Sequence, residues 1–400
     1  MFIVAHYSEI ALKKGNRKFF EQKLKNNILK SLKIYKPKAH LSFGRILVEL
    51  RNIKPLKQKE IFNNEVIPTI RRIFGVSNFA LAFNNEFTSI PQLGKQVLNK
   101  LKEFSTDKVI SFRILATRAD KNFSLSSQEV NEKLGTILQK ELNIAVKLNN
   151  PDLTVFVEIL QKEKHKKNND ILFYFNKYQG AGGLPIGTSG NVIGMISGGI
   201  DSPVACFKIM RRGAKIIFLH FHSYPYTNKS SQKIVEKLVK KLALWQDKSK
   251  LYFVSLADIQ NYILVNAPEK LRVILYRRSM IRICNDIALK EKADAIVTGD
   301  NLGQVASQTL ENIKVIDNSS ALPIFRPLIG DDKQGIIKEA KNIETYDISI
   351  EPHADCCSVF VPKHPETKAK LSDVLEVEKK LKLDKLEKQA IDKIELKTII

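Results

Sequence analysis

The sequence predicts an α/β protein in which two small α+β domains precede a doubly wound parallel sheet. Strand-like and helix-like segments are mixed through the first 165 residues, whereas short apolar runs alternate regularly with helical segments between residues 191 and 328. In addition, a glycine turn joins the first of those later apolar runs directly to a helix. A chain of 400 residues can form two or three domains with substantial cores.

The first domain is expected over residues 1–75. Its predicted elements are a strand over Phe2–Tyr7, a helix over Arg17–Tyr35, a strand over Leu41–Leu50 and a helix over Ile61–Phe74. A basic turn with a glycine, which contains Lys13, Lys14 and Arg17, separates the first two elements. Such a cluster suits RNA phosphates, although a solvated surface loop would have the same composition.

The second domain is expected over residues 76–165, with its first helix beginning as early as residue 60. Its predicted elements are strands over Asn78–Phe83, Val109–Ala116 and Leu153–Leu160 and helices over Pro91–Phe104 and Ser126–Leu142. Ser126 or Ser127, followed by Gln128 and Glu129, favours a capped helix start. We place the domain boundary near residues 165–180, because a charged stretch and a glycine-rich stretch follow one another there.

Cations and aromatic residues occur together in the second domain. Arg113, Arg118 and Lys121 lie close in sequence to Phe112 and Phe123. This combination suits RNA, which offers both phosphates and bases that can stack. Strand alternation nevertheless assigns Phe112 to the core.

The third domain is expected over residues 176–400. Its predicted strands are Val192–Ile196, Ile216–Phe221, Leu251–Leu256, Ala295–Thr298 and Pro323–Leu328, and its predicted helices are Ser230–Trp245, Lys270–Lys290, Leu302–Ile313 and a C-terminal amphipathic Leu371–Leu396. In a doubly wound sheet the ligand lies at the carboxyl ends of the strands. The residues at those ends are therefore the candidates for a site.

The loop after the first of these strands has the sequence SGGIDS, from Ser197 to Ser202. Two adjacent glycines allow main-chain N–H groups to approach an anion, and the helix N-terminus adds partial positive charge. The loop resembles the pyrophosphatase loop of enzymes that split ATP between its α and β phosphates. It is not a Walker loop, because the pattern G-x-x-x-x-G-K-[ST] is absent from the sequence.

Other residues are expected beside this loop. His220 and Phe221 follow the second strand, Gly299 and Asp300 follow a later one, and Gln304, Ser307 and Gln308 come shortly after. These groups could hold adenine by main chain, phosphates by Arg277 or Arg278, and magnesium through Asp201 or Asp300.

Composition points to a polyanionic partner. Lysine and arginine exceed aspartate and glutamate by 65 to 42, a formal charge of +23. Nucleic acid is the first candidate, but lysine used as the default surface residue would give the same excess.

No signal peptide and no apolar run of about 20 residues is visible, so we expect a cytoplasmic protein without a membrane partner. The four cysteines form no C-x-x-C pair, so the sequence supports neither a disulfide framework nor a zinc ribbon. Any cysteine with a special function is expected to be a reduced, reactive thiol.

Five stretches together resemble the tRNA 4-thiouridine synthetase family, the tRNA sulfurtransferases that also serve thiamine biosynthesis. They are HYSEIALKKGNRKFFE, ATRADKNFSLSSQEVN, GAGGLPIGTSGNVIGMISGGIDSPVA, TGDNLGQVASQTLENI and DCCSVFVPKHPET. The resemblance implies an N-terminal ferredoxin-like domain, a THUMP RNA-binding domain and a pyrophosphatase-loop domain. It also implies ATP held around Met195, Ile196, His220, Phe221, Arg277, Gly299 and Gln308, with Ser197, Gly198, Gly199, Asp201 and Ser202 at the phosphates.

The resemblance further implies the reaction. Adenylation of a uracil carbonyl oxygen would open C4 to displacement by a persulfide sulfur, with the loop amides, magnesium and a basic residue stabilising the leaving pyrophosphate. By position in the family pattern, Cys357 is expected to be the thiol that attacks or resolves the persulfide, with Cys356 as the second choice. The chain lacks the rhodanese domain of some members, so we expect direct delivery from a cysteine desulfurase. Family precedent also suggests a homodimer.

Two other functions remain open from the sequence. A small-molecule adenylating ligase or amidotransferase would use the same loop but would leave residues 1–165 and the basic excess unexplained. A nonenzymatic RNA-binding protein with a retired nucleotide fold would bind tRNA without releasing AMP. The intact SGGIDS loop and Cys357 favour an active enzyme.

Overall fold

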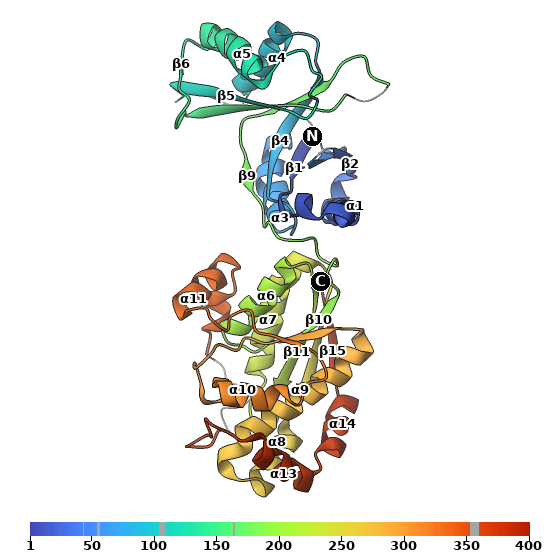
Figure 1. The fold of residues 1–400 in the computed structure, drawn as a ribbon, viewed down its shortest axis with the longest axis vertical. Helices are drawn as coiled ribbons and strands as arrows, with labels where there is room; N and C mark the ends of the chain where they lie inside the picture. The colour runs from blue at the N-terminus through green and yellow to red at the C-terminus, as the bar shows by residue number, and fades with distance from the viewer. Residues whose placement is uncertain (43, 54–56, 104–108, 163–164, 353–359) are drawn as a thin grey trace. The chain divides into compact units, whose positions relative to one another are not determined.

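A computed structural model describes residues 1–42, 44–53, 57–103, 109–162, 165–352 and 360–400. The described chain forms two compact units, Met1–Pro185 and Ile186–Ile400 (Figure 1). Within the described ranges, no helix combines the length and apolar character needed to cross a membrane.

One long strand joins the two halves of the first unit. The strands are β1 (Phe2–His6), β2 (Lys38–Ser42), β3 (Arg45–Glu49), β4 (Asn78–Glu86), β5 (Ser111–Arg118), β6 (Ala145–Val146), β7 (Leu153–Ile159), β8 (Asp170–Tyr174) and β9 (Tyr178–Gln179). Their order is β2-β3-β1-β4-β8-β7-β5-β6, with β9 beside β4. β4 pairs with β1 through Asn78–Ala82 and with β8 through Phe83–Glu86, so it belongs to both halves.

Helices cover this sheet. They are α1 (Arg17–Ser31), α2 (Gln58–Ile61), α3 (Ile67–Arg71), α4 (Ile90–Glu103) and α5 (Ser127–Leu142), and a π-helical turn over Phe62–Val66 separates α2 from α3. The predicted start of α5 is confirmed as a capping box. The Ser126 hydroxyl accepts from the Glu129 amide at 3.1 Å, and the Glu129 carboxylate accepts from the Ser126 amide at 2.8 Å.

Two features of the first unit differ from the sequence prediction. The expected single strand over Leu41–Leu50 is a hairpin of β2 and β3, because Gly44 adopts a φ of +78° that turns the chain. The unit also extends past the predicted boundary near 165–180. β8 and β9 return to pair with β7 and β4, which keeps the chain in this unit up to Pro185.

A buried polar cluster links strands from both halves of the first unit. Glu158 on β7 accepts from Tyr174 at 2.6 Å, lies 2.9 Å from Nε2 of His6 and forms an ion pair with Arg45. Burial alone would raise the pKa of Glu158, but His6, Arg45 and Tyr174 lower it to about 2. The charged carboxylate is therefore the form that stabilises this fold.

We expect Glu158→Gln to destabilise the first unit by about 3 kcal/mol at neutral pH, because it leaves Arg45, whose side chain is only 12% exposed, without its counter-charge. The folded pKa lies below the unfolded value, so the stabilisation is complete above about pH 4.5 and is lost as the pH falls towards 2. Hydrogen exchange of the β1 and β7 amides measures this effect. Glu49→Gln, which removes a carboxylate from an exposed pair with Arg51, should have little effect. Equal protection in both variants would contradict the assignment.

The second unit is built on a six-stranded sheet. Its strands are β10 (Asn191–Met195), β11 (Lys215–His222), β12 (Ser249–Ser255), β13 (Ala295–Val297), β14 (Ile324–Phe325) and β15 (Glu395–Ile399), in the order β14-β13-β10-β11-β12-β15. The first five are parallel, and β15 is antiparallel to β12. The predicted parallel α/β sheet is confirmed, with an added antiparallel edge.

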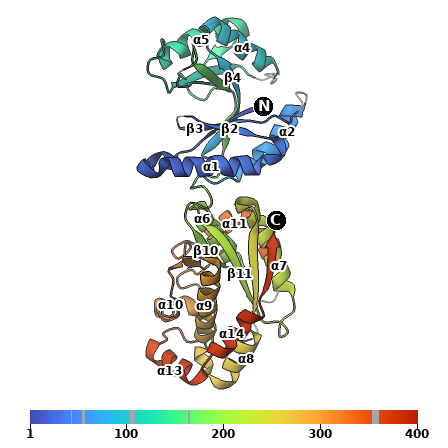
Figure 2. The ribbon, with the colours of Figure 1, turned by 90° about the vertical axis from the view of Figure 1, so that its right-hand side faces the viewer.

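Helices cover both faces of this sheet. They are α6 (Asp201–Arg211), α7 (Ser230–Gln246), α8 (Ala257–Asn266), α9 (Arg272–Glu291), α10 (Leu310–Asp317), α11 (Lys333–Asn342), α12 (Tyr346–Ser349), α13 (Leu371–Leu381) and α14 (Asp384–Asp392). Figure 2 shows α7 and α9 on opposite sides of β10 and β11. Ile193 of β10 shares a buried cluster with Ile281 of α9, whereas Gly194 approaches Cys206 of α6. Successive side chains of β10 therefore point to opposite faces of the sheet, each towards one of the two helical layers.

Two predicted helices of this unit are wrong in extent. The expected Leu371–Leu396 helix ends at Leu381, where Lys382 takes a left-handed conformation, and the chain continues as α14 and strand β15. The expected Leu302–Ile313 helix begins only at Leu310, where the Thr309 side chain caps it. Gly303, at a φ of +73°, belongs to a turn instead.

Candidate active site

The SGGIDS loop is a tight turn between β10 and α6. The Ser197 amide donates to the Ser202 hydroxyl at 2.9 Å, and the two serine hydroxyls are 3.1 Å apart. α6 begins at Asp201, and no side chain from the described residues caps its N-terminus. The first-turn amides of α6 therefore remain available to an anion, as the sequence indicated.

Gly299 lets a second strand end approach this turn. A Cβ atom at Gly299 would lie 2.7 Å from the Ser202 nitrogen and 2.8 Å from its Cα. Real side chains do not tolerate such contacts with backbone, so β13 and α6 meet this closely only because residue 299 has no side chain. The carboxyl ends of β10 and β13 thus lie beside one helix N-terminus.

A cavity of about 470 Å³ lies at these strand ends. It contains eleven of the twelve residues predicted to bind nucleotide: Met195, Ile196, Ser197, Gly199, Asp201, Ser202, His220, Phe221, Arg277, Gly299 and Gln308. Gly198, the twelfth, is buried in the loop and does not line the cavity. The cavity volume lies in the range of small-molecule sites.

Two of these side chains are oriented by hydrogen bonds to other protein groups. Nδ1 of His220 lies 2.9 Å from the Ile196 carbonyl, which can only accept, so Nδ1 carries the proton. Gln308 donates from Nε2 to Asp300 at 3.3 Å, while its buried Oε1 has no hydrogen-bond partner among the described residues. An unpaired buried amide oxygen in a cavity wall is suited to accept an N–H group from a ligand.

Asp300 binds two arginine side chains at the cavity. Its carboxylate accepts from Arg277 at 2.6 Å, from Thr298 at 2.8 Å and from Arg326 at 3.1 Å. Burial by itself would raise the pKa of Asp300, but Arg277, Thr298 and Arg326 hold it below its ordinary value. Asp300 therefore orients Arg277 in the cavity wall.

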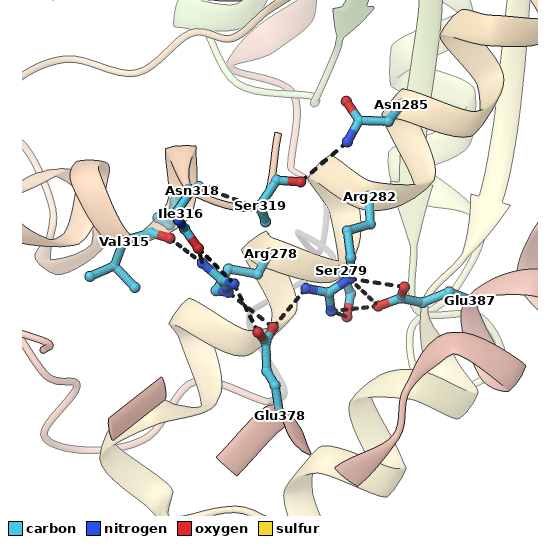
Figure 3. Close-up of polar contacts among 10 residues, drawn as sticks. All are labelled: Arg278, Ser279, Arg282, Asn285, Val315, Ile316, Asn318, Ser319, Glu378 and Glu387. Atoms are coloured by element: carbon cyan, nitrogen blue, oxygen red, sulfur yellow. Dashed lines mark hydrogen bonds and ion pairs between the residues drawn. The ribbon is translucent and has the colours of Figure 1, made fainter. Parts of the chain in front are cut away.

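The structure separates two arginines that reasoning from the residues left open and between which the family resemblance selected Arg277. Arg278 is only 3% exposed and is committed to protein partners: it pairs with Glu378 at 2.8 Å and donates to the Val315 carbonyl (Figure 3). Arg282 joins the same network through Glu378 and Glu387. Arg278 thus attaches α13 to α9, and only Arg277 faces the cavity.

Lys333 is a cation beside the SGGIDS loop that sequence reasoning missed. Its Nζ lies 2.5 Å from Oδ1 of Asp201, and Gln304 donates to Oδ2 of Asp201 at 2.9 Å. Lys333 is the first residue of α11, 132 positions after Asp201. No local pattern marks it, because only the fold brings α11 to the loop.

The predicted magnesium ligands do not fit a metal site. The Asp300 carboxylate is occupied by two guanidinium groups, and both oxygens of Asp201 have protein partners. No cluster of three or more potential ligands occurs within the described ranges. Both carboxylates instead hold the cations Arg277, Arg326 and Lys333.

The proposed sulfur carriers Cys356 and Cys357 lie outside the described residues, but both flanks of their segment contact the site. Before it, the Ser349 hydroxyl donates to the Gly199 carbonyl at 3.3 Å. After it, Val361 and Pro365 line the cavity. The other two cysteines, Cys206 and Cys284, are buried, and burial raises the pKa of both thiols, that of Cys206 to about 12.

The predicted RNA-binding residues lie on the first unit and fall into two groups. Arg17, Arg113 and Arg118 hold protein structure: Arg17 pairs with Glu21, Arg113 donates to Thr154 and Leu148, and Arg118 donates to the Phe123 and Leu125 carbonyls. Lys14 and Lys121 are exposed, and Lys13 lies over the ring of Phe20 at 5.2 Å.

For the two aromatic residues, the predicted RNA contact of Phe123 is wrong and the predicted core position of Phe112 is confirmed. Phe112 is fully buried, as strand alternation indicated, and Phe123 is only 8% exposed, in edge contact with Phe87. Neither ring can stack on a base in this structure, because each one belongs to the core under α5.

Three family profiles match the sequence. They are the ThiI ferredoxin-like domain over residues 2–80, the THUMP domain over 87–163 and the thiamine biosynthesis protein (ThiI) family over 187–383. The predicted succession of ferredoxin-like, THUMP and pyrophosphatase-loop domains is therefore confirmed.

Full-length relatives agree with these profiles. A probable tRNA sulfurtransferase of Alkaliphilus oremlandii is 37% identical over 99% of this chain and 98% of its own length, and one of Thermus thermophilus is 37% identical over 100% and 94%. A crystal structure of a 4-thiouridine synthetase in complex with RNA and ATP is 33% identical, with a TM-score of 0.86 over 100% of this chain and 99% of that one. By domain content, full-length identity and fold, this chain belongs to the tRNA sulfurtransferase (ThiI) family.

Proposed function

We propose that this protein is an ATP-dependent tRNA uracil 4-sulfurtransferase. The observation that carries the proposal is the cavity at the SGGIDS loop, a space of nucleotide size lined by loop residues and Arg277, beside the open amides of α6 and the Asp201–Lys333 ion pair. The similar 4-thiouridine synthetase was crystallised with RNA and bound ATP, which supports both ligands for this chain. The target is a uridine of tRNA, at position 8 as the family resemblance implies.

In the first step, the O4 atom of uracil attacks the α-phosphorus of ATP. A bond from O4 to phosphorus forms, the bond from the α-phosphorus to the bridging oxygen breaks, and pyrophosphate leaves. The α6 amides and Lys333 are placed to stabilise the charge that develops on the phosphates. Magnesium, which the sequence led us to expect, would reach this site only as a companion of the triphosphate.

In the second step, the terminal sulfur of a Cys357 persulfide attacks C4. The C4–S bond forms and AMP leaves with the electrons of the C4–O bond. A second thiol then attacks the Cys357 sulfur, so the base keeps the transferred sulfur and a disulfide forms. A thiol reductant restores Cys357. The contacts of Ser349 and Val361 support this role, because they hold both flanks of the cysteine segment at the cavity.

The sulfur would come from a cysteine desulfurase, and the same persulfide could supply sulfur for the thiazole of thiamine, as the name of the matching family suggests. A homodimer is the assembly that the resemblance implies. The two rival functions are less well supported, since the full-length relatives are named as tRNA sulfurtransferases.

The proposal is tested by incubating the protein with tRNA, ATP and a persulfide-generating desulfurase. We expect 4-thiouridine in the digested tRNA, with one AMP and one pyrophosphate released for each thiolated base. Pyrophosphate exchange without RNA would instead favour a small-molecule ligase.

Asp201→Ala is expected to lower tRNA-dependent pyrophosphate release by about a hundredfold and to leave tRNA affinity within twofold. Without this carboxylate, Lys333 and Gln304 lose the group that holds them at the loop. Asp258→Ala, which removes an exposed carboxylate of the same unit, is the control. Full activity of the Asp201 variant would remove the loop from the mechanism.

Binding of tRNA should weaken steeply with salt, because each contacted phosphate releases a counterion. Replacing Lys13, Lys14 and Lys121 by alanine should make the plot of log affinity against log salt shallower by about 2 to 3. The control removes equal charge from exposed positions of the C-terminal helical region, Lys380, Lys388 and Lys393. Equal slopes for both triple variants would assign RNA contact to other residues.

A further inference from the structure

Two tyrosines on the loop between β11 and α7 expose their rings to solvent. Tyr224 is 46% exposed and Tyr226 is 50% exposed, whereas Tyr252 and Tyr276 in the same unit are each 1% exposed. Two aromatic rings that are exposed on one short loop lack the stabilisation that burial usually gives such side chains. This loop is therefore a candidate for ligand contact that the nucleotide cavity does not explain.

The loop is held in place by its neighbours. The Ser223 hydroxyl is fully buried and donates to Gln260 at 2.6 Å, and the Thr227 amide donates to the Ser223 carbonyl at 3.2 Å. The Tyr226 ring makes an edge contact with the buried ring of Phe360, at 5.4 Å between centroids. The tyrosines therefore project from a supported backbone, which lowers the entropy lost when they bind.

The position of the loop connects it to the reaction. It begins after His222, the last residue of β11, whose neighbour Phe221 lines the cavity, and Tyr226 contacts Phe360, whose neighbour Val361 also lines the cavity. The Nζ of Lys229 lies 5.1 Å from the centre of the Tyr224 ring. Exposed rings with a cation at the edge of the site are the combination that binds unpaired nucleotides, through base stacking and phosphate attraction.

We propose that Tyr224 and Tyr226 form a stacking platform for an unpaired base next to the target uridine. This proposal rests on the proposed function and extends it. A base inside a folded tRNA is stacked on its neighbours, so an enzyme that brings uracil C4 to ATP must separate them. The platform would supply a new stacking partner for the neighbouring base, with Lys229 near its phosphate.

The test compares Tyr226→Ala and Tyr224→Ala with Tyr262→Ala, which removes a 38% exposed tyrosine from α8. Each platform variant should raise the KM for tRNA about tenfold, with unchanged ATP affinity, whereas Tyr262→Ala should match the wild type. Tyr226→Phe and Tyr226→Trp should restore a low KM, because stacking needs the ring and not the hydroxyl. ATP affinity and thermal unfolding report whether each variant is folded.

A direct readout uses tRNA with 2-aminopurine on either side of the target uridine. Binding to the wild type should change the fluorescence of one of these probes, and Tyr226→Ala should abolish that change. An unchanged KM and an unchanged fluorescence response in both alanine variants would overturn the proposal. Slower persulfide loading by the desulfurase with an unchanged KM for tRNA would also overturn it, since the surface would then contact the sulfur donor. Failure of the wild type to thiolate tRNA would instead refute the proposed function.

Discussion

Gly299→Ala is expected to lower pyrophosphate release by at least about a hundredfold and to weaken ATP binding to a similar degree. The added Cβ would lie 2.7 Å from the Ser202 nitrogen, and the atoms that must move are backbone atoms at the start of α6. Neither β13 nor α6 can shift without displacing the loop amides from the phosphates. A displacement of about 1 Å in such a site is enough for a hundredfold loss.

The measurements are ATP titration by calorimetry and tRNA-dependent pyrophosphate release. The control is Gly330→Ala, because a Cβ at Gly330 meets no atom within 4 Å and its φ is not in the left-handed range. The control should retain activity within twofold. Since overpacking also costs about 1–3 kcal/mol of stability, thermal unfolding of both variants separates a local defect from unfolding. Normal ATP affinity in Gly299→Ala would show that the turn can relax and that its geometry is not required.

Cys357→Ala is expected to eliminate 4-thiouridine formation while tRNA affinity and ATP affinity stay within twofold. Our proposed mechanism places the transferred sulfur on this residue, and no other group can replace a persulfide in that step. Adenylation precedes sulfur transfer, so AMP release should fall while a single turnover of pyrophosphate persists. Quantitative mass spectrometry of digested tRNA nucleosides measures the product.

Cys356→Ala is the matched control, since it removes the adjacent thiol and leaves Cys357 in place. It should keep most of the thiolation activity. If Cys356→Ala is inactive and Cys357→Ala is active, the two roles are exchanged. If both variants thiolate tRNA at the wild-type rate, the sulfur is not carried by this segment.

Much of the fold could be predicted because the signals are local. The apolar run before Ser197, the paired glycines and the helix that directly follows them lie within about twenty residues, and they appear in the structure as β10, the loop and α6. The capping box at Ser126 is equally local. The weaker predictions concern turns inside longer patterns, such as Gly44 in the β2–β3 hairpin and Lys382 after α13, where a single left-handed residue changes the direction of the chain.

In the candidate site, too, some residues could be predicted from the sequence and others could not. Strand ends, the glycine loop and the family resemblance together indicated eleven residues of the cavity wall. The strand ends contribute because the carboxyl ends of parallel strands meet at one edge of a sheet. Reasoning from the residues alone left Arg277 and Arg278 open, and only the resemblance selected Arg277, since the difference depends on Glu378, about a hundred residues later. Phe123 was misassigned to RNA for a similar reason, because its burial depends on contact with Phe87.

By itself, the amino-acid sequence determined the order of the domains, the SGGIDS turn and the family, because strand, glycine loop and helix are encoded by neighbouring residues. Only the tertiary structure decided which charged side chains pair with one another and which groups are buried or exposed. It placed Lys333 against Asp201, committed Arg278 to the C-terminal helices, enclosed Glu158 among strands of both halves of the first unit and left Tyr224 and Tyr226 exposed near the cavity. The physical reason is that electrostatic pairing and burial depend on distance in space, and residues that are far apart in sequence leave no periodic pattern to reveal it.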